Sequence, residues 1–552
     1  MLEMFRHPTF CKGDLMSTPT PTLSAAVRPP QPETFHVFDT TLRDGAQQEG
    51  LRLSVPDKIR IATLLDELGV GYIEGGWPGA NPNDTEFFSA AARGDLLLKN
   101  AALVAFGSTR RAGGRAADDP LVAATRASGA QVACLVAKSH DGHVERALRT
   151  SLAENLEMIR DTVTHLRSEG MRVFIDCEHF FDGWLRNSDY SREVLQTIAE
   201  AGAEVAVLCD TNGGMMPSWV SEVVGEVAEI GLPLGIHCHN DTGCAVANTM
   251  AAVEAGAMHV QGTINGYGER TGNADLGTVL ANLELKYGWS VLPHADSLTE
   301  LTRISHAISA VTNVPDVPRQ PYVGVSAFAH KAGLHASAIK VDPNLYQHID
   351  PALVGNDMRM LISDMAGRAN IQIKGEELGF DLSDRDLAAE ITDVVKGREA
   401  NGYSYEAADA SFELLLRDCL GQLDKPFEII NWRVLTQAAR EDAAVTEATV
   451  KLSAKDEVQA VVGEGNGPVD ALAEALRRAL QPAFPDVMHY DLTDYRVRII
   501  DSGHGTDASV RVLIDTRDGE RSWTTVGVGT NVIEASWEAL SDAYLYGLVK
   551  AD

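Results

Sequence analysis

Basic residues are scarce in this sequence. Lys and Arg number 47 against 78 Asp and Glu, which leaves a formal net charge of −31. Such a chain repels phosphate groups, so neither nucleic acid nor an anionic membrane is an expected partner. An anionic substrate would need basic residues close to its own site.

Cysteines and long apolar runs are also scarce. The 7 cysteines form no CxxC pair, and their odd number fits a reducing compartment, so we predict a cytoplasmic protein. No apolar run approaches the roughly 18–20 residues that span a bilayer. Residues 1–33 carry charge, Pro and Thr without an apolar signal core, which predicts a disordered leader and makes Met16 an alternative start to Met1.

A regular alternation of short apolar runs and amphipathic stretches begins at residue 35. Eight such β–α alternations within about 260 residues predict an α/β fold, a TIM (β/α)8 barrel over residues 34–296. A doubly wound sheet is the alternative, but no GxGxxG follows the first run. The predicted strands are 35–38, 70–73, 102–106, 132–137, 173–175, 205–208, 234–236 and 260–264.

The alternation of apolar runs and amphipathic stretches ends after Trp289, and two further regions follow. Residues 297–430 have a mostly helical pattern and are predicted to form linker subdomains. Residues 431–552 contain six strand-like segments and two helical ones, which predicts a separate α+β domain.

A candidate metal site combines residues from three predicted strand ends. His237 and His239 are two residues apart at the end of a strand, so their side chains project to the same side. Asp44 follows the first strand, and Asn273 follows the eighth and offers a further oxygen. Two imidazoles and a carboxylate suit Zn, Mn, Fe or Co, and Mg less naturally. The alternative is a pair of hydrogen-bonded histidines, which the placement at a barrel rim disfavours.

Three more polar residues follow predicted strands, each with an ordinary structural alternative. Arg43 has a guanidinium suited to a keto oxygen or carboxylate, or to an ion pair across the barrel mouth. Glu178 is a candidate general base, or a structural hydrogen-bonding group. Thr211 is a candidate donor to a substrate carboxylate, or a helix cap.

Two long motifs carry a resemblance to a known family. Segments 38–47 (FDTTLRDGAQ) and 237–241 (HCHND) with 262–273 (GTINGYGERTGN) resemble the two signatures of the α-isopropylmalate synthase / homocitrate synthase family. The resemblance continues through 332–337 and 465–470, so it covers nearly everything from residue 35 onward. Segment 74–82 most resembles the branch of this family that forms citramalate.

The resemblance implies a Claisen-type condensation of acetyl-CoA with a 2-oxo acid, followed by thioester hydrolysis. In this branch the oxo acid is pyruvate, and the product, (R)-citramalate, is an isoleucine precursor. The C-terminal domain then resembles an allosteric domain, with isoleucine as the expected effector and a homodimer as the expected assembly. The alternatives are 2-isopropylmalate synthase, a lyase of the hydroxymethylglutaryl-CoA type, and an amino-acid-sensing protein with an inactive barrel.

The resemblance also implies roles for individual residues. His335 matches a linker-region histidine that helps the base, and Tyr346 matches a tyrosine from the same region, whereas Ser337 departs from an aspartate typical of the isopropylmalate branch. Trp77, just past the second strand, is predicted to fill the space that a longer 2-oxo acid would need. The remaining matches are metal ligands (Asp44, His237, His239, with Asn273), oxo-acid contacts (Arg43, Thr211) and the catalytic carboxylate (Glu178).

Overall fold

The computed structural model describes residues 29–362, 367–437, 445–500, 508–519 and 521–550. Its described residues form two compact units. One contains the residues up to Phe328 together with 349–357, and the other contains 329–348 and the residues from Met358 onward. The predicted domain limits at residues 33, 296 and 430 stay predictions. Most of the predicted leader lies outside the described residues.

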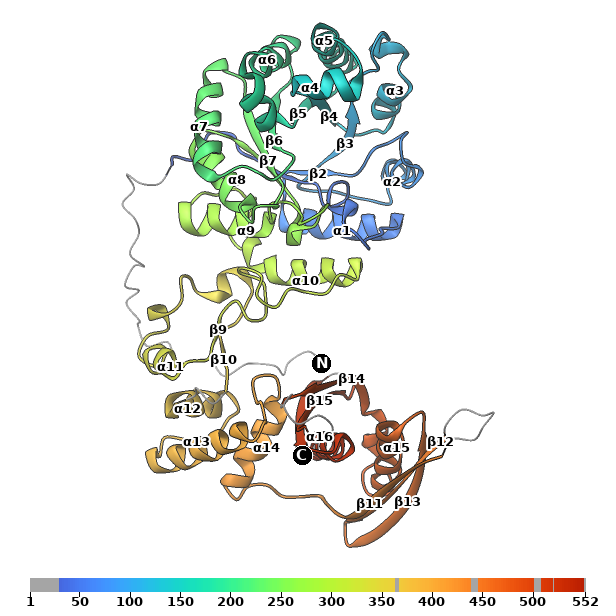
Figure 1. The fold of residues 1–552 in the computed structure, drawn as a ribbon, viewed down its shortest axis with the longest axis vertical. Coiled ribbons are helices and arrows are strands. Elements are labelled where there is room, and N and C mark those ends of the chain that lie inside the picture. Colours follow the sequence, from blue (N-terminus) through green and yellow to red (C-terminus); the bar gives the residue numbers. More distant parts are fainter. Residues whose placement is uncertain (1–28, 363–366, 438–444, 501–507, 520, 551–552) are drawn as a thin grey trace. The chain divides into compact units, whose positions relative to one another are not determined.

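The first unit is a closed barrel of eight parallel strands in sequential order, surrounded by helices (Figure 1). This confirms the predicted TIM barrel. The strands are β1 (His36–Asp39), β2 (Tyr72–Glu74), β3 (Ala102–Ser108), β4 (Val132–Lys138), β5 (Arg172–Glu178), β6 (Val205–Asp210), β7 (Leu234–Cys238) and β8 (His259–Gly262). The helices are α1 (Val55–Leu68), α2 (Pro82–Arg93), α3 (Pro120–Ala127), α4 (Asp141–His143), α5 (Leu152–Ser168), α6 (Phe180–Ala201), α7 (Pro217–Val227), α8 (Ala245–Glu254), α9 (Leu276–Ala281) and α10 (Leu301–Thr312).

Burial on both faces explains why these strands read as apolar runs. One buried cluster fills the barrel interior with side chains such as Phe38, Val104 and Phe174. A larger cluster lies between the strands and the helices and includes Ile73, Ile175 and other aliphatic residues. Strands covered on both faces are the usual case in parallel sheets.

Local signals set the ends of the barrel helices. Ser54 caps α1 in a capping box with Asp57, and Asp119 caps α3 by accepting from two backbone N–H groups. Each such cap satisfies donors that the first helical turn leaves without partners.

The segment before β1 is also attached to the barrel unit. The Gln31 side chain and the Ser290 backbone exchange two hydrogen bonds, which hold the last residues before β1 in place.

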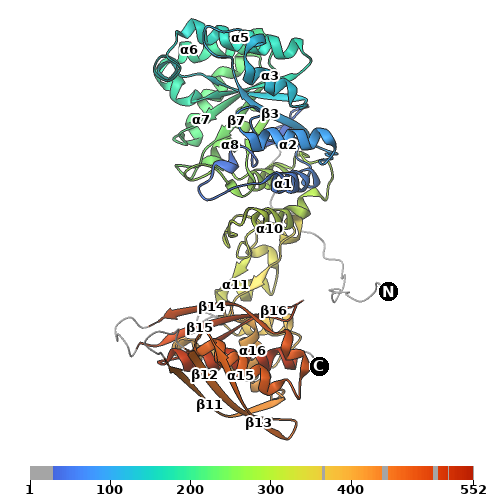
Figure 2. The same ribbon diagram turned by 90° about the vertical axis from the view of Figure 1, so that its right-hand side faces the viewer.

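The second unit begins with short helices and continues as an α+β domain. The parallel pair β9 (Ala329–His330) and β10 (Arg359–Met360) accompanies α11 (Gly333–Ile339), α12 (Arg368–Glu377), α13 (Arg385–Ala400) and α14 (Asp409–Cys419). Two antiparallel sheets follow, β11 (Phe427–Gln437), β12 (Val445–Ala454) and β13 (Glu457–Gly465), then β14 (Asp491–Ile499), β15 (Val510–Arg517) and β16 (Ser522–Gly529). Figure 2 shows α15 (Pro468–Leu480) and α16 (Val532–Val549) between these sheets.

The two helices cover one face of each sheet. α15 packs on β12 and β13, α16 packs on β15 and β16, and the helices contact each other. The predicted helical region and C-terminal α+β domain are therefore confirmed as elements of the fold. In the described part of the chain, no helix combines the length and apolar character that crossing a membrane requires.

Candidate active site

A cavity of about 720 Å³ opens at the carboxyl ends of the barrel strands. It is lined by side chains that follow or end strands far apart in the sequence, as in other barrels of this type. Seven of the predicted site residues line it: Arg43, Asp44, Trp77, Glu178, Thr211, His237 and His239.

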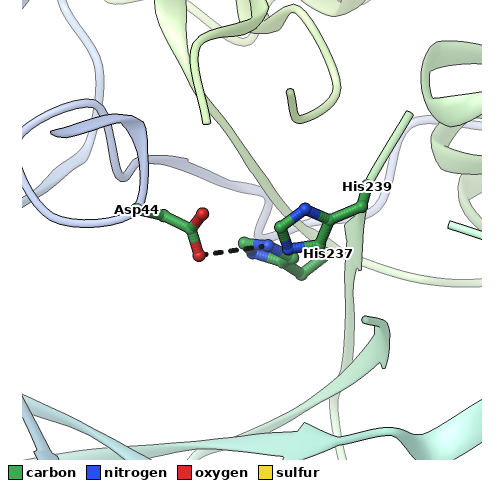
Figure 3. A group of neighbouring side chains, drawn as sticks. All are labelled: Asp44, His237 and His239. Atoms are coloured by element: carbon green, nitrogen blue, oxygen red, sulfur yellow. Dashed lines mark ion pairs between the residues drawn. The ribbon is translucent and has the colours of Figure 1, made fainter. Parts of the chain in front are cut away.

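Asp44, His237 and His239 form a compact, buried cluster. Each offers one ligand atom, and these atoms all lie within 4.8 Å of one another. The His237 Nε2 is 3.7 Å from the Asp44 Oδ2, and Figure 3 shows the carboxylate directed at the two imidazole rings. The structure thus brings together the three residues that the sequence analysis grouped as metal ligands.

Asn273 completes this cluster from the loop after β8. Its Nδ2 donates to the Asp44 Oδ1 at 3.0 Å and to the Tyr267 carbonyl at 3.0 Å. In the described structure its Oδ1 is buried without a hydrogen-bond partner, and so is the His239 Nδ1. Buried polar atoms without partners are rare, and two of them beside a carboxylate and an imidazole fit a bound cation.

Glycine lets this loop close around Asn273. Gly268 has φ +152°, and a Cβ there would lie 2.3 Å from the Asn273 Nδ2. Gly272 has φ +89°, and a Cβ there would lie 2.0 Å from the Gly266 carbonyl oxygen. Both positions therefore combine a left-handed backbone with a close approach that only glycine accommodates.

Burial and neighbouring charges keep Asp44 and His239 in the protonation states that bind a cation. Burial favours the neutral carboxyl of Asp44, but the Arg43 guanidinium and the two imidazoles outweigh it and bring its pKa well below the usual range. Burial, with the neighbouring His237, lowers the pKa of His239 to about 4. At neutral pH the site therefore offers a carboxylate and an uncharged imidazole, as cation binding requires.

His237 is oriented by Gln261, a residue that the sequence analysis did not single out. The His237 Nδ1 lies 2.9 Å from the Gln261 Oε1, and the Gln261 Nε2 donates to the Asp176 Oδ1 at 2.9 Å. A proton on Nδ1 leaves the lone pair of Nε2 facing Asp44. The only signal in the sequence is an amide within the apolar run of β8.

Arg43 is held on several sides at the cavity wall. Its Nε donates to the Glu74 Oε2 at 2.7 Å, and its Nη1 donates to the Asp44 Oδ2 at 2.7 Å. The guanidinium carbon lies 4.0 Å from the centroid of the Phe106 ring. The ion pairs considered from the sequence are thus present, and Arg43 also lines the cavity. Glu74, the last residue of β2, is fully buried beside this guanidinium, and the sequence had suggested no role for it.

Glu178, Thr211 and Trp77 lie at other points of the cavity. Glu178 is the last residue of β5 and pairs with Lys138 of β4. The Thr211 Oγ1 accepts the backbone N–H of His179 at 2.8 Å, at the start of α6. Trp77 stands edge-on to Phe106, with ring centroids 5.3 Å apart.

His335 and Tyr346 lie in the second unit. Their rings stack with centroids 4.1 Å apart, and His330 lies beside His335 at 6.2 Å. Their roles toward the barrel cavity stay predictions.

Comparison with known proteins gives the family. The profile of the HMGL-like family matches residues 34–308, that of the homocitrate synthase post-HMGL domain matches residues 322–401, and that of the LeuA allosteric (dimerisation) domain matches residues 406–548. An (R)-citramalate synthase of Streptomyces coelicolor is 62% identical over 522 residues, which cover 94% of this chain and 97% of that protein. The chain belongs to the isopropylmalate synthase / homocitrate synthase family.

Other relatives place the chain within this family. An (R)-citramalate synthase of Aquifex aeolicus is 46% identical over 94% of this chain and 98% of that protein. A 2-isopropylmalate synthase of Methanocaldococcus jannaschii is 31% identical over 93% of this chain and 94% of that protein. The chain is therefore an acyltransferase of the acetyl-CoA-condensing type.

Proposed function

We propose that this enzyme condenses acetyl-CoA with pyruvate and water to give (R)-citramalate and CoA. The observation that carries the proposal is the meeting of Asp44, His237 and His239 with Arg43 and Glu178 around one cavity. Five relatives named (R)-citramalate synthase are 44–62% identical and support pyruvate as the oxo acid, whereas the relatives named 2-isopropylmalate synthase or probable 2-isopropylmalate synthase are 31–33% identical, as is one putative (R)-citramalate synthase.

Asp44, His237 and His239, with the Asn273 Oδ1 beside them, would hold a divalent cation. The donor set suits Mn, Zn or Co, and Mg less naturally. Bound there, such a cation supplies Lewis-acid polarisation of the keto group.

The chain's own residues supply binding and proton transfer. Arg43 places positive charge at the keto oxygen or carboxylate of pyruvate, and Thr211 donates its hydroxyl to the carboxylate. Glu178 removes a proton from the acetyl methyl group, and that carbon forms a bond to the keto carbon of pyruvate. The carbonyl electron pair moves to oxygen, which takes a proton. Water then adds to the thioester carbonyl, the C–S bond breaks, and the CoA thiolate leaves and takes a proton.

The second unit has a regulatory function in this proposal. We propose that isoleucine, the expected end product, binds in the region that matches the allosteric domain, and that two chains assemble through it. His335 and Tyr346 assist the base. The cytoplasmic location expected from the cysteine content belongs to the same proposal.

A thiol-release assay with acetyl-CoA over a panel of 2-oxo acids tests the proposal. We expect kcat/KM to be highest for pyruvate. Preference for 2-oxoisovalerate would make the protein a 2-isopropylmalate synthase, and absence of turnover with every 2-oxo acid would revive the amino-acid-sensing alternative.

A further inference from the structure

Lys138 is the cation paired with Glu178 at the edge of the cavity. The two residues lie opposite each other in the parallel register of β4 and β5, and the Lys138 Nζ forms an ion pair with the Glu178 Oε2. Their side chains are only 23% and 26% exposed. A pair so shielded from water interacts more strongly than a surface pair.

The strand ends that carry this pair are fixed by hydrogen bonds. The Asn155 Nδ2 donates to the Lys138 carbonyl at 2.8 Å and also lies 2.8 Å from the Tyr190 hydroxyl. Next along the chain, the Ser139 hydroxyl donates to the Glu178 carbonyl at 2.8 Å. These hydrogen bonds restrict the backbone of both Lys138 and Glu178, so the two paired side chains are attached to backbone positions that move little.

Three imidazoles form a cluster beside this pair, and the pKa of one of them, His143, responds to the charges of Lys138 and Arg146. His143 lies between His140 and His179, with ring centroids 4.7 and 4.2 Å away, and Asp182 lies 3.5 Å from the His179 Nδ1. Burial, with His179 and His140, lowers the pKa of His143 to about 4, so this ring is uncharged at neutral pH. Burial lowers the pKa of Lys138 from its ordinary value, and its ammonium group forms the ion pair with the Glu178 carboxylate.

A general base has to be ionised and aimed at the proton it removes. A cation within about 4–6 Å of a carboxyl lowers its pKa by about 1–3 units, and an ion pair to one oxygen limits the rotation of the group. We propose that Lys138 is a positioning residue, whose ammonium group aims the Glu178 carboxylate at the acetyl methyl group and keeps it ionised. This rests on the proposed function, which makes Glu178 the base.

The test compares Lys138→Met with Lys138→Arg. Thiol release is measured from about pH 3 to 9.5, because a carboxyl paired with a cation titrates below its ordinary value of about 4.3, with acetyl-CoA and the 2-oxo acid that the wild type uses best. For Lys138→Met we expect kcat at pH 7 to fall about tenfold or more and the acid limb of the kcat profile to move up by about one pH unit, while KM for the 2-oxo acid changes less than about twofold. Lys138→Arg restores the acid limb because it keeps the charge.

Lys374 offers a matched control. It is a buried lysine of the second unit, with its Nζ 3.0 Å from the Asp409 Oδ2. Lys374→Met should lower the melting temperature and leave the acid limb unmoved, which separates loss of a buried ion pair from loss of base positioning. If Lys138→Met does not fold, Lys138→Gln takes its place.

An acid limb that stays in place in the Met or Gln variant overturns the proposal, whatever the loss in kcat, and so does failure of arginine to restore it. Two other results test the proposed function independently of Lys138. Wild-type rates in Glu178→Gln would remove the base assignment and this proposal with it, but leave the condensation standing. A wild type that turns over no 2-oxo acid would overturn both.

Discussion

At the scale of single residues, the orientation of His237 is expected to govern how tightly the cluster binds a cation. The contact between the His237 Nδ1 and the Gln261 Oε1 fixes which nitrogen of the ring faces Asp44. Removal of the hydrogen-bond partner of a metal-binding histidine typically weakens metal binding about 10–100-fold.

Gln261→Leu is therefore expected to weaken Mn²⁺ binding about 10–100-fold, as measured by calorimetric titration. Asn248→Leu serves as the control, because Asn248 is another buried amide of the barrel unit and donates to the Met215 carbonyl. An Mn²⁺ affinity of Gln261→Leu equal to that of the wild type would show that Gln261 does not orient the ligand.

Trp77 is the residue we expect to select the oxo acid. It lines the cavity and stands edge-on to Phe106, which itself lies against Arg43. Trp77→Ala should raise kcat/KM for 2-oxoisovalerate relative to pyruvate by about 10–200-fold, the range for one or a few methylenes in a pocket. Trp219, which is 51% exposed on α7, provides the control variant Trp219→Ala. An unchanged ratio in Trp77→Ala would remove Trp77 from selectivity.

At the scale of elements, β1 and β8 carry a pair of histidines in the barrel interior, and this pair links stability to pH. The His36 and His259 Nδ1 atoms lie 3.4 Å apart, and His259 is fully buried, beside Phe174. Burial, with His36 beside it, brings the pKa of His259 well below its ordinary value. The folded barrel therefore keeps this ring neutral where the unfolded chain would protonate it.

The sign of the effect follows from proton uptake. The contribution of the neutral His259 ring to the free energy of unfolding is fully present above about pH 6.5. As the pH falls below this value, that contribution is lost by about 1.4 kcal/mol per pH unit. We expect His259→Phe to flatten the dependence of the free energy of unfolding on pH between about 6.5 and 5 by that amount, as measured by urea titration. His294→Phe alters an exposed histidine of the same unit and should keep the wild-type slope. Parallel pH curves for the wild type and His259→Phe would contradict the assignment.

Much of the barrel was predictable because its strands are buried on both faces. All eight were located from apolar runs, but their ends were set too early where polar side chains belong to the strand. β5 was predicted at 173–175 and spans Arg172–Glu178, since Asp176 and Glu178 face the cavity from within the strand. The rule that polar residues mark loops fails at the strand ends that form the site.

Pairwise contacts across the barrel could not be predicted. Gln261 meets His237 because β7 and β8 are in register at those two residues. That register exists only once the barrel is closed, so no spacing in the sequence carries it. The cluster of Asp44, His237 and His239 was predictable because each residue follows or ends a strand and the residue types suit a metal.

At the scale of the whole molecule, the C-terminal sheets carry exposed apolar side chains. Val458 and Val462 of β13 are 58% and 49% exposed, and Leu435 of β11 is 62% exposed. The match to the LeuA allosteric (dimerisation) domain covers these strands. An apolar face of this kind is expected to be covered by a second copy of the chain.

We therefore expect light scattering to give twice the mass of one chain and isoleucine to lower the rate of thiol release. Val462→Glu should shift the mass toward that of one chain, because it adds a charge to a surface that dimerisation would bury. Valine and leucine serve as the control amino acids for inhibition. A single-chain mass for the wild type, together with a rate indifferent to isoleucine, would refute the regulatory assignment.

The most direct test of the account is restoration of activity by metal in the chelated protein. Thiol release from acetyl-CoA and pyruvate should vanish after chelation and return on addition of Mn²⁺. In Asp44→Asn, which loses the charge but not the shape of the ligand, Mn²⁺ should bind at least tenfold more weakly and kcat/KM should fall about 1,000-fold or more. Full activity of the chelated wild type, or wild-type Mn²⁺ affinity and turnover in Asp44→Asn, would contradict a cation held by Asp44, His237 and His239.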